Sequence, residues 1–99
     1  MRLSEYQIET IRKETVKAFG PRAVVRLFGS RVDDTRRGGD IDLHIETELP
    51  SGEAHRAADR LYVALIRKLG DQQIDIIIHT IGTPVRTIDQ MATRTGKVL

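Results

Sequence analysis

The sequence predicts an α+β fold in which helices flank a small mixed β-sheet, with the elements in the order α-β-β-α-β-α. Three segments carry apolar residues at helical spacing, and three others carry them in alternation with polar residues or in a short run. Two strand-like segments follow one another directly and the third comes after a helix, so we expect a mixed sheet covered by helices. The 99 residues have room for one domain, residues 1–99, and little room for a second one that binds substrate.

The bulk composition is that of a soluble globular protein, with 39% hydrophobic and 30% charged residues. No cysteine is present, so the sequence offers neither a disulfide framework nor a thiolate metal site, which fits a reducing compartment. The N-terminus lacks the apolar region of a signal peptide, and no apolar run approaches membrane-spanning length. We therefore expect a cytoplasmic protein with no membrane partner.

The first helix is predicted over residues 4–19. Ser4 and Gln7 have the spacing of a capping box, in which each side chain bonds the other residue's backbone N–H. The residues that then follow on one helical face are Ile8, Ile11, Thr15 and Ala18. Gly20 and Pro21 end the helix, because glycine adopts the left-handed capping conformation and proline lacks a backbone donor.

Three strands are predicted, over residues 23–28, 40–46 and 74–79. The first is apolar apart from Arg26 and stops at Gly29. The second alternates strictly, and its polar face consists of Asp40, Asp42, His44 and Glu46. The third also alternates, and the face that carries its carboxylate consists of Asp75, Ile77 and His79.

Two further helices complete the predicted fold. A helix over residues 53–69 follows a short loop and carries a regular apolar stripe. The last helix is predicted to have Thr83 as its N-cap and Pro84 as its first residue, and to run as far as Gly96.

Asp40 and Asp42 are the first candidate site residues. Two carboxylates on one strand face beside apolar neighbours repel each other unless a positive charge lies between them. A divalent cation is the simplest such charge, because Mg²⁺ prefers oxygen ligands and takes one or two carboxylates together with waters and phosphates. The alternative is that both aspartates form the solvent face of an amphipathic strand. Asp75 lies between Ile74 and Ile76, where a carboxylate is costly unless it is exposed or bound to metal or to an arginine.

A phosphate site is predicted before the second strand. Gly29 permits close backbone approach, and the hydroxyl of Ser30 and nearby amides can hold phosphate oxygens. The linker that follows suits charge-assisted contacts with phosphate, and its arginines are Arg31, Arg36 and Arg37. Two further arginines lie nearby in the sequence, Arg22 and Arg26. This arginine cluster is either a solvated surface or an attractor for a polyanionic nucleotide.

The order of these motifs resembles the nucleotidyltransferase superfamily related to DNA polymerase β, and most closely its minimal members. The signature is a Gly-Ser turn, a short linker, an Asp-x-Asp strand and a third acidic residue on a later strand. The matching residues are Gly29, Ser30, Asp40, Asp42 and Asp75. The resemblance implies that the three aspartates hold one or two Mg²⁺ ions and catalyse transfer, with Asp75 also a candidate general base. It also implies that Gly29, Ser30 and Arg31 bind the triphosphate.

The resemblance implies an enzyme that transfers a nucleoside monophosphate, AMP from ATP, to a hydroxyl group. Because the chain has no second domain for an acceptor, we expect the acceptor on a partner protein. Minimal members of the family resemble the antitoxins of HEPN/MNT toxin–antitoxin pairs, which silence a HEPN-type toxin by adenylylating a tyrosine or by binding. The alternative function is a non-catalytic antitoxin or nucleotide-binding module that neutralises its partner by binding.

A nucleic-acid binder is a third interpretation, but the net charge of +2 is not concentrated enough to predict nucleic acid as a direct partner. His44 shares the face of Asp40 and Asp42 and is interpreted as a polar-face residue, with substrate contact as the alternative. His55 and His79 are interpreted as structural or solvated. Assembly into a homo- or hetero-oligomer remains open.

Overall fold

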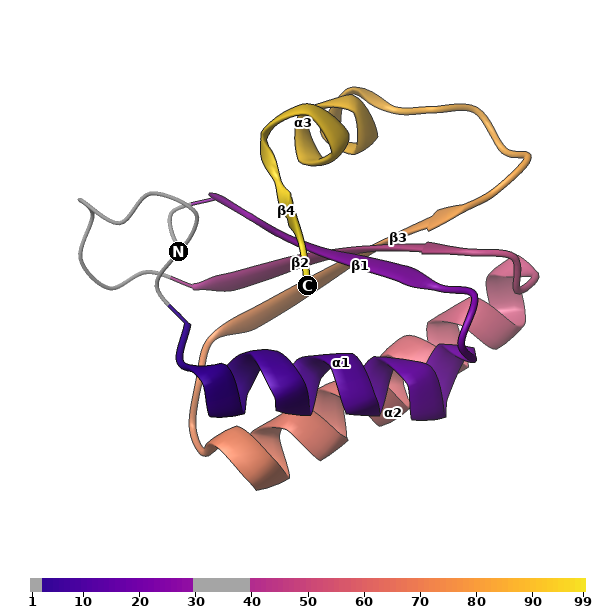
Figure 1. Cartoon of the computed structure of the whole chain (residues 1–99). Helices are drawn as coiled ribbons and strands as arrows, with labels where there is room; N and C mark the ends of the chain where they lie inside the picture. The colour runs from indigo at the N-terminus through magenta and orange to yellow at the C-terminus, as the bar shows by residue number, and fades with distance from the viewer. Residues whose placement is uncertain (1–2, 30–39) are drawn as a thin grey trace.

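The computed structural model describes residues 3–29 and 40–99, which form three helices and a four-stranded sheet (Figure 1). The helices are α1 (Glu5–Phe19), α2 (Ser51–Leu69) and α3 (Thr87–Thr95). The strands are β1 (Val24–Phe28), β2 (Ile41–Thr47), β3 (Ile74–Thr80) and β4 (Lys97–Val98). The predicted α+β class is confirmed, and the predicted order of six elements is followed by one additional strand.

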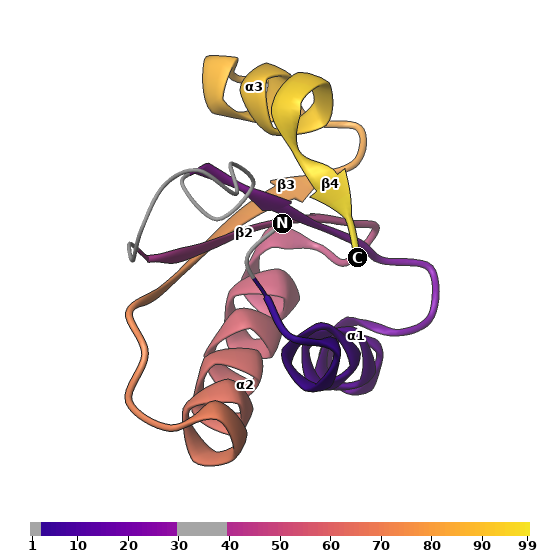
Figure 2. The same ribbon diagram turned by 60° about the vertical axis from the view of Figure 1, so that its left-hand side comes forward.

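The sheet is mixed, with the strand order β3-β2-β1-β4. Strand β1 is antiparallel to both β2 and β4, whereas β2 and β3 are parallel. A parallel pair needs a crossover connection, and α2 supplies it. Helix α2 lies beside α1 on one face of the sheet, and α3 lies on the other face (Figure 2). One face is therefore covered by two helices, and the other only in part.

The apolar core lies on the sheet face that meets α1 and α2. Strand β2 contributes three side chains that are 0% exposed, Ile41, Leu43 and Ile45. The helices contribute further buried side chains, among them Ile11, Leu61 and Leu65. Each such side chain contributes about 1.5–3 kcal/mol relative to an exposed one. Because strand side chains alternate, this burial places the polar residues of β2 on the opposite face, and a slip of one residue would bury them instead.

Helix α1 begins with the predicted capping box. The Ser4 hydroxyl accepts a hydrogen bond from the backbone N–H of Gln7 at 3.1 Å, and the Gln7 side chain accepts one from the backbone N–H of Ser4 at 2.8 Å. These two bonds satisfy backbone donors that have no partner within the helix. The N-terminal boundary of α1 is thus set locally, as the sequence predicts.

A buried carboxylate joins α1 to α2. Glu14 is 7% exposed, and its carboxylate lies 3.1 Å from Nζ of Lys68 and 3.4 Å from Nζ of Lys17. The hydrogen bond from Lys68 is the main cause that holds the pKa of Glu14 below its ordinary value. The Tyr6 hydroxyl also donates to the backbone oxygen of Lys68, at 3.4 Å. Polar contacts thus supplement the apolar contact between the two helices.

The last helix begins later than predicted. Thr83 is not its N-cap, because the backbone N–H and the hydroxyl of Thr83 both donate to the backbone oxygen of Thr80, at 3.1 and 2.6 Å. These bonds close a turn after β3. The N-cap is Arg86, whose backbone N–H donates to the carboxylate of Asp89 at 2.8 Å. Because Thr83 closes a turn and Asp89 caps the helix at Arg86, the helix begins at Thr87, later than the sequence predicts.

The first helix and the three predicted strands agree with their predicted bounds to within one residue, whereas α2 and β4 differ more. Helix α2 begins at Ser51, so it includes residues predicted as a loop. Strand β4 is only two residues long and was not predicted, because so short a segment shows no alternation. It pairs with β1, where Arg26 and Leu27 lie opposite Val98 and Lys97. The chain end therefore covers one edge of the sheet.

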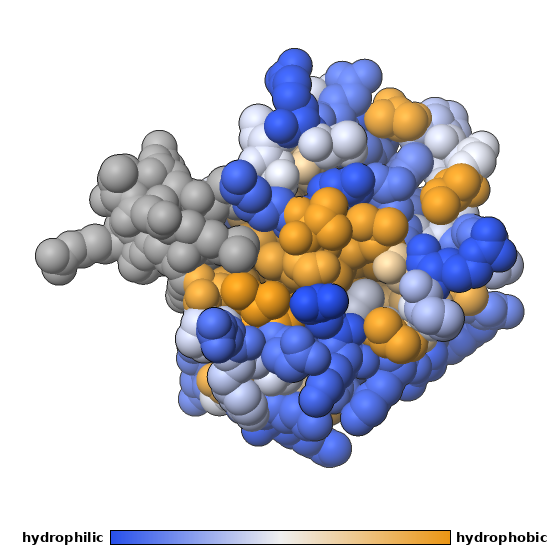
Figure 3. Space-filling model, in the orientation of Figure 1, coloured by the Kyte–Doolittle hydropathy of each residue, from blue (hydrophilic) through white to orange (hydrophobic). Residues whose placement is uncertain are grey.

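The surface near this edge is apolar. Figure 3 shows an apolar area at the centre of the face drawn in Figure 1, where β4 and the C-terminus lie. Val98 of β4 is 63% exposed, and Met91 of the neighbouring α3 is 42% exposed.

None of the described helices has the length and hydropathy of a membrane span.

Glu14 makes the stability of the fold depend on pH. Because its pKa in the folded state is lowered from about 4.5, its carboxylate stabilises the fold above that pH, and this stability is lost as the pH falls through the folded-state pKa. We expect Glu14→Gln to lower the Tm by roughly 5 °C at pH 7 and by clearly less at pH 3. Thermal unfolding followed by circular dichroism measures both values.

The control for this comparison is Glu9→Gln. Glu9 is on the same helix but 55% exposed, and its carboxylate lies 4.0 Å from Arg12. An exposed pair of this kind contributes little, so its Tm should change by no more than about 2 °C at either pH. An equal Tm loss for Glu14→Gln at both pH values would contradict the assignment.

Candidate functional site

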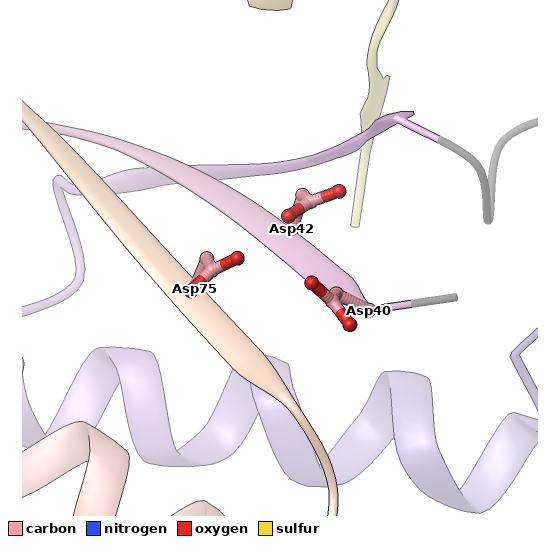
Figure 4. A group of neighbouring side chains, drawn as sticks. All are labelled: Asp40, Asp42 and Asp75. Atoms are coloured by element: carbon pink, nitrogen blue, oxygen red, sulfur yellow. The ribbon is translucent and has the colours of Figure 1, made fainter.

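Three carboxylates come together where β2 and β3 begin. One oxygen from each of Asp40, Asp42 and Asp75 lies within 4.8 Å of those from the other two (Figure 4). The parallel register places Asp42 opposite Asp75, and Asp40 lies two residues before Asp42 on the same face. The sequence pattern left open whether Asp75 shares this face, and the structure shows that it does.

These carboxylates are poorly compensated among the described residues. Burial is the main cause that raises the pKa of Asp42, and the negative charges of Asp75 and Asp40 raise it further. In residues 3–29 and 40–99, no lysine or arginine pairs with any of the three. A cluster of oxygen donors that repel one another suits a hard divalent cation, and Mg²⁺ has this ligand preference. The residues present therefore fit the predicted cation site.

Gly29 is required by the position of Asp42. It follows β1 directly and has φ of +81°, a left-handed conformation that favours glycine. A Cβ on Gly29 would collide with Oδ2 of Asp42. Within the described residues Gly29 thus lies close to the Asp42 carboxylate, and its contact with phosphate stays a prediction. Ser30 and Arg31, the other two predicted phosphate-binding residues, lie outside the described residues.

The arginine cluster of the sequence is partly engaged in ion pairs. Arg26 of β1 lies 2.5 Å from Glu46 of β2, and Arg22 lies 2.9 Å from Glu48. These two guanidinium groups are thus paired with carboxylates, which favours a structural role for them. The other three arginines of the cluster, Arg31, Arg36 and Arg37, lie outside the described residues.

His44 lies on the predicted face but is not solvated. It is 0% exposed, and its Nε2 lies 2.7 Å from Oδ1 of Asp89 on α3. His44 thus lies on the face of β2 on which it was predicted, and the bond to Asp89 shows that α3 packs over this part of the strand. No sequence signal pointed to Asp89, since it lies on an element distant in the chain.

An open groove of about 820 Å³ runs along β3 beside the site. Its lining includes Ile76, the neighbour of Asp75, and Tyr62 of α2, but none of the three carboxylates. The carboxylates are instead on open surface, with Asp75 exposed and the other two half-buried. A substrate can therefore reach them from solvent.

The sequence matches the family model for a nucleotidyltransferase domain over residues 8–94. The chain belongs to this family. The matched span contains the three carboxylates and Gly29, so the predicted superfamily is confirmed and nucleotidyl transfer is supported as the general activity. A search of curated proteins found no match to the sequence.

Divalent cation should stabilise this nucleotidyltransferase domain through the three carboxylates. At a Mg²⁺ concentration a hundredfold above Kd, binding contributes about 2.7 kcal/mol, or roughly 10–20 °C in Tm. We expect Asp42→Asn to reduce this rise to less than about 3 °C, since it removes one charged ligand. Asp71 is an exposed aspartate outside the cluster, so Asp71→Asn should keep the full rise in Tm. Thermal unfolding with and without Mg²⁺ tests this, and an equal rise in both variants would contradict the cation site.

Gly29→Ala should weaken cation binding about tenfold, because the new Cβ displaces the carboxylate of Asp42. Titration with Mn²⁺, followed by calorimetry, measures the change in Kd. Gly70→Ala is a matched control, since Gly70 has φ of +82° but nothing lies within 4 Å of an added Cβ. Both variants place alanine at a positive φ, which costs about 1–3 kcal/mol of stability, but only the first should lose affinity. The same Kd in both variants would refute the role of Gly29.

Proposed function

We propose that this domain transfers AMP from ATP to a hydroxyl group on a partner protein. The observation that carries the proposal is the convergence of Asp40, Asp42 and Asp75 in a chain that belongs to the nucleotidyltransferase domain family. In this proposal Asp40 and Asp42 hold one or two Mg²⁺ ions, and Asp75 is a further ligand. When bound, Mg²⁺ neutralises phosphate oxygens and orients the triphosphate.

The residues of the chain then have separate tasks. The turn formed by Gly29 and Ser30 binds the β and γ phosphates with help from Arg31. The acceptor oxygen attacks the α-phosphorus, the bond to the β-phosphate oxygen breaks, and pyrophosphate leaves. Asp75 accepts the proton of the hydroxyl, and its exposure supports this role because the acceptor arrives from outside.

The acceptor is proposed to be another protein because the carboxylates lie on open surface, with Asp75 exposed, where a large acceptor can reach them. The resemblance to minimal nucleotidyltransferases favours a HEPN-type toxin, so that the domain acts as the antitoxin of a toxin–antitoxin pair and modifies a tyrosine. A cytoplasmic location and assembly with the partner or with a second copy belong to the same proposal. Masking of the partner without chemistry is the alternative outcome of the test.

The test uses intact-mass spectrometry of both proteins. The domain is incubated with Mg²⁺, one nucleoside triphosphate at a time, and the protein encoded by the neighbouring gene. We expect an AMP adduct on that protein with ATP, and a rate at least about a hundredfold lower for Asp42→Asn and Asp75→Asn. Asp71→Asn is the control and should keep the full rate. A tight complex with no adduct under any nucleotide would instead support masking.

A further inference from the structure

A buried polar network lies on the same sheet face as the three carboxylates. Nε2 of His44 on β2 lies 2.7 Å from Oδ1 of Asp89 on α3. Asp89 is 2% exposed and accepts hydrogen bonds from Nε and Nη2 of Arg86, each at 3.0 Å. Nη2 of Arg86 also donates to the backbone oxygen of Ile78 on β3, at 2.6 Å. The His44–Asp89–Arg86 network therefore ties α3 to both strands that carry the carboxylates.

The network anchors α3 from one end, while β4, which follows the helix, pairs with β1 at the other. Of the nine residues in this helix, only Asp89 and Ala92 are buried. The methyl group of Ala92 offers little apolar surface, so apolar burial contributes little to the position of the helix. Burial acts to raise the pKa of Asp89, but hydrogen bonds from Arg86 and His44 outweigh it and hold the pKa well below its ordinary value. Asp89 is thus a carboxylate anion, and the N–H of His44 donates to it.

The network also adjoins the candidate site. His44 is the second residue after Asp42 on the same face of β2. Its ring meets the ring of Phe28 edge to face, with centroids 6.4 Å apart. Phe28 is the register partner of Asp42 and directly precedes Gly29, whose backbone meets the Asp42 carboxylate. His44 therefore supports the corner at which Gly29 and Asp42 come together.

Stability alone does not account for these residues. Buried ion pairs can often be replaced by apolar side chains of similar volume with no loss of stability, because burying charge is costly. His44 bears a further cost, since its Nδ1 has no hydrogen-bond partner among the described residues. Hydrogen bonds hold the side chains they join in a single defined orientation, which apolar contacts do not do.

We infer that His44 is a positioning residue for nucleotidyl transfer: through Asp89 and Arg86 it holds α3 in one place, and through Phe28 it fixes the geometry of Gly29 and Asp42. The inference rests on the proposed function only for its kinetic part. Its other part, the geometry of the carboxylates, can be measured by cation binding without nucleotide. The two parts can therefore fail separately.

The first variant pair compares two amides at one position. The side-chain amide of His44→Gln reaches as far as the imidazole Nε2 and can still donate to Asp89, whereas the shorter amide of His44→Asn cannot. We expect His44→Gln to keep the Mn²⁺ Kd and the kcat within threefold of the wild type. His44→Asn should weaken Mn²⁺ binding about tenfold and lower kcat at least tenfold, with less than a threefold change in KM for ATP. Electron paramagnetic resonance measures Mn²⁺ binding without nucleotide.

The second variant removes the network while filling its volume. The double variant His44→Leu with Asp89→Leu loses the Asp89 cap of α3 but fills the same volume, so its Tm should fall by no more than roughly 5 °C, yet it should bind Mn²⁺ about tenfold more weakly. Glu14→Gln is the control for buried charge, because Glu14 lies between the two helices on the opposite face of the sheet. It should lower the Tm and leave the Mn²⁺ Kd unchanged.

The outcomes separate the two proposals. Equal Mn²⁺ affinity in His44→Asn, His44→Gln and the wild type would overturn the positioning role, whether or not the double variant folds. If the wild type transfers no nucleotide but the two amides still differ in Mn²⁺ affinity, the proposed function fails and the positioning role stands. If nucleotide transfer occurs and His44→Gln and His44→Asn have equal kcat, the positioning role fails and the proposed function stands.

Discussion

The parallel pairing of β2 with β3 is the constraint on which the candidate site depends. It places Asp42 opposite Asp75 and holds like charges together against their repulsion. The opposite face of β2 supplies the driving force, because its apolar side chains are fully buried against α1 and α2. A slip of one residue would move them to the other face of the sheet. The core thus stabilises an arrangement of carboxylates that would be unfavourable by itself.

The carboxylate face changes from open to buried along the strands. Asp75 is exposed and Asp42 is half-buried, whereas His44, two residues further along β2, is completely buried among Asp89 of α3, Phe28 and His79. Charged groups at the open end can meet a cation and a substrate from solvent. Polar groups at the covered end must find partners within the protein: His44 pairs with Asp89, and Asp89 pairs in turn with Arg86. The same face can therefore hold both a reactive surface and an internal support.

Local patterns could be predicted from the sequence, and non-local ones could not. The shared face of Asp40 and Asp42 follows from the alternation within one strand, which the structure confirms. Whether Asp75 joins them depends on which strand pairs with β2 and in which register, and alternation does not decide this. Thr83 can cap a helix or close a turn with the same hydroxyl, so its role was predicted wrongly. The burial of His44 depends on packing against α3, and the sequence of β2 contains no pattern that indicates it.

The crossover through α2 has a consequence for folding. Because β2 and β3 are parallel, the whole of α2 lies between Asp42 and Asp75 in the chain, and the two meet only when this long loop has closed. Contacts so distant in sequence form slowly compared with helices and hairpins. In a collapsed chain whose β3 has not yet paired with β2, only two of the three carboxylates are in place at the site. A divalent cation held by all three carboxylates would therefore bind folded molecules in preference to incompletely folded ones and would shift the population toward the native state.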